Sequence, residues 1–159
     1  MMKKSLQFGA AAAAVAVVIG MGAVATMAED LAAVVKERQG LMKQQSDDLK
    51  VIKAYIDGGT DQAAAVEKAK SLTAISAKLP EVWPAGTSSK DFPGKSNAKP
   101  DIWQDMTKFK ATLATVKAAD EKLLEALEKG DRAAAGAAFG DLGKNGCGAC
   151  HGSFREKLT

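Results

Sequence analysis

Apolar residues recur at helical spacing along most of the chain after residue 29, and this spacing most restricts the fold. Charged residues fill the intervening positions in the stretch that follows Asp30, whose apolar members are Leu31, Val34, Val35, Met42, Leu49, Ile52 and Ile56. Because an α-helix repeats every 3.6 residues, this spacing puts the apolar side chains on one face. No window shows the sustained alternation of β-branched and polar residues that a half-buried strand needs. The sequence therefore predicts an all-α protein.

Glycine and proline divide this pattern into separate helices. Gly58-Gly59 should end the first helix, since glycine readily takes the positive φ of a helix C-terminus, and Thr60 is placed to cap the second. The second helix should end at Pro80. Its predicted inward face consists of Val66, Ala69, Leu72, Ile75 and Leu79.

A longer connection and a third helix follow. Residues 80–99 are rich in proline, glycine and serine, which predicts an irregular crossover, and Trp83 and Phe92 are the side chains that would attach it to the helices. Pro100 suits a first helical position, and Gly130 suits a helix end. The third apolar face between them consists of Ile102, Met106, Phe109, Leu113, Val116, Leu123 and Leu127.

The fourth predicted helix is capped by Asp131 and runs from about Arg132 towards Leu158. Four helices joined by two short turns and one longer crossover, between the second and third, predict an antiparallel four-helix bundle. Several glycines interrupt the last helix: Gly140, Gly143, Gly146 and Gly148. Each costs a helix interior roughly 1 kcal/mol relative to alanine. Their number indicates either that something bulky approaches the backbone closely or that the helix frays or kinks.

The first 28 residues have the pattern of an export signal. Lys3 and Lys4 form a basic start, residues 8–25 carry no charge, and small residues lead to a cleavage site after Ala28. The competing interpretation is a permanent membrane anchor, because the uncharged stretch approaches the length that spans a bilayer. The many alanines and the glycines make it weakly hydrophobic and favour the cleaved signal. We therefore expect a periplasmic location in a bacterium and no membrane attachment after cleavage.

The mature chain, residues 29–159, is expected to form one domain and is close to neutral. The formal net charge of the whole chain is +3, and Lys3 and Lys4 supply two of these charges. Basic residues are spread among acidic ones, so no patch resembles a nucleic-acid footprint. We expect no nucleic-acid partner.

Both cysteines and the single histidine of the chain fall together as Cys147-Gly148-Ala149-Cys150-His151. Two thiols three residues apart on a helix can add to the two vinyl groups of one haem, and the adjacent imidazole is then held over the iron. The motif predicts one covalent haem c attached through Cys147 and Cys150, with His151 as an axial ligand.

Other interpretations explain less of this motif. A disulfide or a thioredoxin-type redox pair uses the same cysteine spacing, but neither accounts for His151, and the redox motif expects a βαβ context. A structural zinc site needs a fourth ligand, and the chain has no further cysteine or histidine.

Further segments add a family resemblance that spans residues 29–159. The segments that carry it, together with the haem motif, are Arg38-Gln39-Gly40-Leu41-Met42, Trp83-Pro84-Ala85-Gly86-Thr87, Ile102-Trp103 and Phe154-Arg155. With these segments the chain resembles the class II c-type cytochromes, the group of cytochrome c prime and its low-spin relatives. The resemblance implies that Arg38 lies near a haem propionate and that Met42 stands on the distal side of the iron. Arg155, four residues after His151, could also reach a propionate or face solvent.

Met42 separates two possible functions. If its thioether is the sixth iron ligand, the protein is a one-electron carrier that works with redox partner proteins. If Met42 only packs, the resemblance implies a five-coordinate haem protein that binds nitric oxide or carbon monoxide. We expect ligation by Met42 and assign Met106 to the core.

An enzyme such as a peroxidase is not expected, because no second histidine is available for acid–base chemistry above the iron. The sequence leaves open whether the protein is a monomer or a homodimer.

Overall fold

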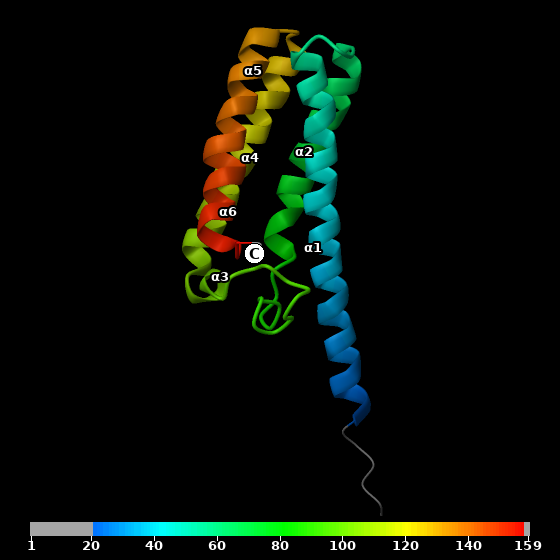
Figure 1. The fold of residues 1–159 in the computed structure, drawn as a ribbon, viewed down its shortest axis with the longest axis vertical. Coiled ribbons are helices and arrows are strands. Elements are labelled where there is room, and N and C mark those ends of the chain that lie inside the picture. The colour runs from blue at the N-terminus through cyan, green and yellow to red at the C-terminus, as the bar shows by residue number, and fades with distance from the viewer. Residues whose placement is uncertain (1–20, 158–159) are drawn as a thin grey trace, which may run out of the picture.

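The computed structural model describes residues 21–157, with side chains described from residue 30 onward, and it shows the predicted antiparallel four-helix bundle (Figure 1). The first three long helices are α1 (Met21–Ile56), α2 (Gln62–Lys78) and α4 (Met106–Glu128). The fourth arm is continuous and consists of α5 (Arg132–Asp141), the π-helical segment η2 (Leu142–Gly148) and α6 (Ala149–Phe154). The crossover between α2 and α4 contains two short elements, η1 (Leu79–Glu81) and α3 (Asp101–Gln104).

Aspartates cap the helices at both short turns. Asp131 caps α5 as predicted, its carboxylate accepting a hydrogen bond from the Ala134 amide at 2.9 Å. The predicted cap at Thr60 is wrong by one residue, because Asp61 accepts the equivalent bond from Ala64 at 2.8 Å. A carboxylate in this position also interacts favourably with the positive end of the helix dipole.

The third predicted helix is broken near its start, which the sequence analysis did not anticipate. Asp105 has non-helical backbone angles of φ −136° and ψ 71° and separates α3 from α4. Its carboxylate accepts a hydrogen bond from the Lys108 amide at 2.9 Å. The side chain thus begins a new helix where the apolar spacing alone indicated a continuous one.

The predicted export signal lies largely outside the described residues. Residues 1–20 are outside them, and residues 21–28 form the first turns of α1. None of the helices formed by residues 21–157 combines the length and hydropathy that crossing a bilayer requires.

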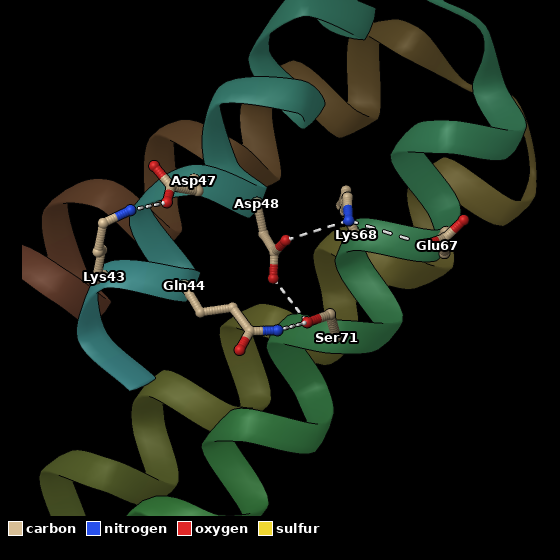
Figure 2. Close-up of polar contacts among 7 residues, drawn as sticks. All are labelled: Lys43, Gln44, Asp47, Asp48, Glu67, Lys68 and Ser71. Atoms are coloured by element: carbon tan, nitrogen blue, oxygen red, sulfur yellow. Dashed lines mark hydrogen bonds and ion pairs between the residues drawn. The ribbon is translucent and has the colours of Figure 1, made fainter. Parts of the chain in front are cut away.

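A polar network joins α1 to α2 (Figure 2). Asp48 on α1 is buried and accepts a hydrogen bond from Ser71 Oγ on α2 at 2.6 Å, while Lys68 Nζ lies 3.7 Å from its other oxygen. Gln44, one turn earlier on α1, donates to the same Ser71 hydroxyl at 3.2 Å. These contacts hold α1 along α2 and so position the side chains on the other faces of α1.

The apolar core consists of two clusters. One includes Ile52, Leu72 and Leu123 from α1, α2 and α4, and the other lies at the crossover end around Ile102 and Phe109. Cys150 packs against both clusters.

The crossover is tied to the end of the chain. Lys99 donates its amide to the Phe154 carbonyl at 2.9 Å, and Glu156 donates to the Asn97 carbonyl at 2.8 Å. The end of α6 is thereby held beside the crossover (Figure 1).

Candidate functional site

A large cavity lies within the bundle beside the cysteine motif. Its volume is about 840 Å³, and its lining is contributed by α1, α4, the crossover and the fourth arm. α4 packs along α2, α5, η2 and α6, whereas α1 packs on α2 and α5, so space remains between α1 and the last turns of the fourth arm. All six residues predicted for the site line this cavity: Arg38, Met42, Cys147, Cys150, His151 and Arg155.

The helix is widened around Cys147, just before Cys150. The Ala149 amide bonds to the Lys144 carbonyl, five residues earlier, which is the pattern of a π-helix. A side chain at Gly148 would place its Cβ 3.0 Å from the Gly143 carbonyl oxygen. Glycine at position 148 therefore lets the widened turn form.

Gly146, in the same segment, lies close to the Leu142 side chain. A Cβ at Gly146 would lie 3.0 Å from Leu142 Cδ1 and 3.8 Å from Val116 Cα. Gly140 and Gly143 have no such neighbours within 4 Å. The neighbours at 3.0 Å belong to the fourth arm itself, so the approach of a separate bulky group to these glycines stays a prediction.

Burial sets the protonation of the motif. It raises the pKa of Cys147 and brings the pKa of Cys150 to about 11, and it lowers the pKa of His151, with Arg155 adding to the last effect. Burial thus disfavours the thiolate form of both cysteines in the chain without its cofactor. A neutral imidazole is the form that ligates a metal.

Among residues 21–157 no cluster of three histidine, cysteine or acidic side chains that could hold a metal ion is found.

Arg38 is buried where α1 meets the crossover, although surface arginines are the rule. Its guanidinium donates to the Val82 carbonyl at 3.3 Å, to Thr87 Oγ1 at 3.2 Å and to the Thr87 carbonyl at 2.9 Å. A further bond reaches Ser96 Oγ at 3.1 Å, and the group stacks 4.3 Å from the centre of the Trp83 ring. Arg38 thus attaches the crossover to α1.

The charge of Arg38 is not balanced by an acidic partner among the ion pairs of the described residues. Burial lowers its pKa to about 10, so the side chain remains a cation. Beside it, the buried indole N–H of Trp83 has no hydrogen-bond acceptor among the described residues. A cation and a free donor at one end of the cavity favour an anionic, acceptor-rich group there.

Other predicted residues differ in burial. Met42 is half-buried and packs against the crossover-end cluster, as does Met106, but only Met42 lines the cavity. Arg155 lines the cavity and is exposed, so its side chain can also face solvent.

Several residues of the site were not predicted from the sequence. Trp83 was expected only to attach the crossover, and Gln45 was not singled out, yet both line the cavity and carry a buried donor without a partner. The spacing of Gln45, seven residues after Arg38, was the available signal. A buried Ser76–Asp120 hydrogen bond between α2 and α4 was also missed, because its partners are 44 residues apart.

Comparisons with known proteins give a consistent result. The family model described as Cytochrome C' matches residues 33–155. Cytochrome c' from Pararhodospirillum photometricum is 33% identical over 125 residues, covering 78% of this chain and 97% of the relative.

Solved structures also match. A cytochrome c' described as showing ligand-controlled dimer dissociation has a TM-score of 0.74 and 25% identity, covering 80% of this chain and 97% of that one. The nitric oxide complex of a variant cytochrome c prime from Alcaligenes xylosoxidans has a TM-score of 0.69 and 28% identity, and the match covers 79% of this chain and 95% of that one. The protein described here therefore belongs to the cytochrome c' family and binds one covalent haem c.

Proposed function

We propose that this protein is an exported haem protein that binds a diatomic gas such as nitric oxide or carbon monoxide. In this proposal Cys147 and Cys150 form the thioether bonds to haem, and His151 is an axial ligand of its iron. The observation that carries the proposal is the cavity, which these three residues line together. The nitric oxide complex of a cytochrome c prime relative supports the choice of ligand.

The residues of the cavity fit this cofactor. The volume of about 840 Å³ lies in the range of small-molecule and cofactor sites. Apolar side chains dominate the lining, including Leu49, Phe109 and Leu113, and would shield the macrocycle from water. The Arg38 cation and the Trp83 N–H form a polar end that suits the propionate carboxylates. Arg155, at the exposed edge, is placed to contact a propionate from outside.

Different side chains have different roles around the haem iron. Bound haem supplies an iron that can exchange an electron or take a small ligand. His151, from α6, has a lowered pKa and offers a neutral imidazole. Met42 lines the cavity from α1, across the bundle from α6 (Figure 1), and with its apolar neighbours would limit access to small uncharged ligands.

A second function, one-electron transfer with a redox partner protein, is favoured by the position of Met42. Its thioether lines the same cavity as His151, and a thioether is a known haem-iron ligand that raises the reduction potential. Ligation by Met42 would close the distal site to gases. The two functions therefore make opposite predictions for one residue.

The spin state of the purified protein tests the choice. A gas-binding protein should be high-spin and bind carbon monoxide when reduced, and Met42→Ala should speed gas binding without changing the spin state. A carrier should be low-spin, and Met42→Ala should make it high-spin and lower its reduction potential. Visible and near-infrared spectra of both proteins decide between them. A low-spin spectrum in both would contradict both functions and would make Met106 or a lysine the next ligand to test.

The export and attachment steps have their own test. Residues 1–28 are proposed to be removed after Ala28, which releases a periplasmic protein. Intact-mass analysis of periplasmic material should give the mass of residues 29–159 plus one haem that acid-acetone cannot extract. A mass without the haem increment would contradict attachment, and a retained N-terminus would contradict cleavage.

A further inference from the structure

Gln45 is a buried amide in the wall of the cavity that nothing in the proposed haem attachment uses. It lies on α1 with Arg38, Met42 and Leu49, and all four line the cavity at spacings of four, three and four residues. This spacing places them on one stripe of the helix. Only 9% of Gln45 is exposed, and its carboxamide nitrogen is shielded from solvent without any acceptor among the described residues.

An amide donor in this state costs free energy unless something supplies an acceptor. Nearly all buried donors in folded proteins have a partner, so the exceptions indicate a group that the protein chain does not supply. The neighbouring Gln44 shows the ordinary case, because its amide faces α2 and donates to Ser71 Oγ (Figure 2). Gln45 faces the cavity instead.

The position of Gln45 separates it from the polar end of the cavity. With a rise of about 1.5 Å per residue, Gln45 lies roughly 10 Å along α1 from Arg38 and about one turn beyond Met42. Gln45 is therefore nearer along the helix to Met42 than to the Arg38 end of the cavity. The last torsion of a glutamine side chain is soft, so the amide can turn to meet a ligand that enters the cavity.

We propose that Gln45 donates a hydrogen bond to a diatomic ligand of the haem iron, which makes this distal pocket polar at one point. This inference rests on the proposed gas-binding function and deepens it. Such a donor favours ligands whose outer atom carries partial negative charge, and it retains them longer. The apolar side chains exclude water, and Gln45 then selects among the small molecules that enter.

The test compares Gln45→Leu with Gln44→Leu, which makes the same chemical change one residue away, on the side of α1 that faces α2 and outside the cavity lining. The reduced proteins are saturated with carbon monoxide, and the C–O stretching frequency and the dissociation rate of the gas are measured. Loss of the donor in Gln45→Leu should raise the frequency and speed dissociation about fivefold, the effect of one neutral hydrogen bond. Gln44→Leu should match the wild type in both.

The same pair of variants is also made in the Met42→Ala background, so that ligation by Met42 does not hide the result. Carbon monoxide adducts whose frequency and dissociation rate are unchanged by Gln45→Leu would overturn the role of Gln45 alone. Failure of both the wild type and Met42→Ala to bind the gas would overturn the proposed function, and this inference with it. Thermal unfolding of each variant verifies that the compared proteins are folded.

Discussion

At the scale of single residues, Arg38 links the fold to the site. Its guanidinium holds the crossover through Val82, Thr87 and Ser96, and it supplies the charge at the polar end of the cavity. Arg38→Met should lower the free energy of unfolding by about 1.5–3 kcal/mol, the range for a hydrogen bond to a charged group. It should also lower the haem reduction potential, because a nearby cation disfavours the more positive ferric state.

Unfolding in guanidinium chloride measures the stability of Arg38→Met, and potentiometric titration measures its reduction potential. Arg155→Met is the matched control for the unfolding measurement alone, since Arg155 is exposed, and its free energy of unfolding should stay within about 0.5 kcal/mol of wild type. An unchanged potential in Arg38→Met would contradict its placement beside the propionates.

Asp120 is a residue whose ionisation should affect stability. Burial raises the pKa of its carboxyl from 3.8 to about 6, although Ser76 partly offsets this by hydrogen bonding. Between these values the folded protein holds the proton more tightly than the unfolded chain, so stability falls as pH rises. The decrease in the free energy of unfolding caused by Asp120 should reach up to about 3 kcal/mol once the pH exceeds the folded pKa.

Urea unfolding of wild type and Asp120→Asn over this pH range measures that contribution. The free energy of unfolding of Asp120→Asn should not show this decline with rising pH, because the asparagine amide does not titrate. Asp101→Asn changes an exposed carboxyl and should keep the wild-type profile. A decline of the same size in Asp120→Asn would show that other groups cause it.

At the scale of elements, the π-helical segment η2 positions the cysteine motif. Gly148→Ala would bring a Cβ to 3.0 Å from the Gly143 carbonyl oxygen, and the backbone must shift to relieve the contact. We expect a destabilisation of about 1–3 kcal/mol, the usual cost of overpacking. Gly140→Ala, in α5 with open space around it, should instead stabilise by about 0.5–1 kcal/mol.

Chemical unfolding of the two glycine variants checks this contrast, and the haem absorbance of Gly148→Ala reports on attachment. Equal stability changes in both variants would mean that the widened turn does not depend on glycine at position 148.

At the scale of the whole molecule, the bundle is built around its cavity. Two apolar clusters meet at Cys150, and a space of about 840 Å³ adjoins them. Single large-to-small truncations in a core already cost about 2–5 kcal/mol, and loss of haem from this space should cost more. Cys147→Ala/Cys150→Ala should therefore be loosely packed, with a lower Tm and faster amide hydrogen exchange. A variant without haem but with the Tm of the holoprotein would show that the core is complete without its cofactor.

The sequence by itself determined the features that rest on local signals. Helical spacing of apolar residues predicted the bundle, glycine and proline placed the long crossover, and the cap at Asp131 was recognised because its partner is only three residues away. The spacing of Cys147, Cys150 and His151 predicted the haem c that the family binds. These signals act within about one turn of helix, so they are readable without a fold.

Only the tertiary structure decided the remaining features, because they depend on residues distant in the chain. One exception is the break at Asp105, whose cap on Lys108 is local and was concealed by the continuous apolar spacing. The widened turn of η2 packs on α4, which is a contact between distant parts of the chain. The burial of Arg38 and Gln45 against one cavity, and the pairing of Ser76 with Asp120, arise where separate helices meet. Periodicity identifies the face on which a side chain lies, whereas its partners are set by the helices that pack against that face.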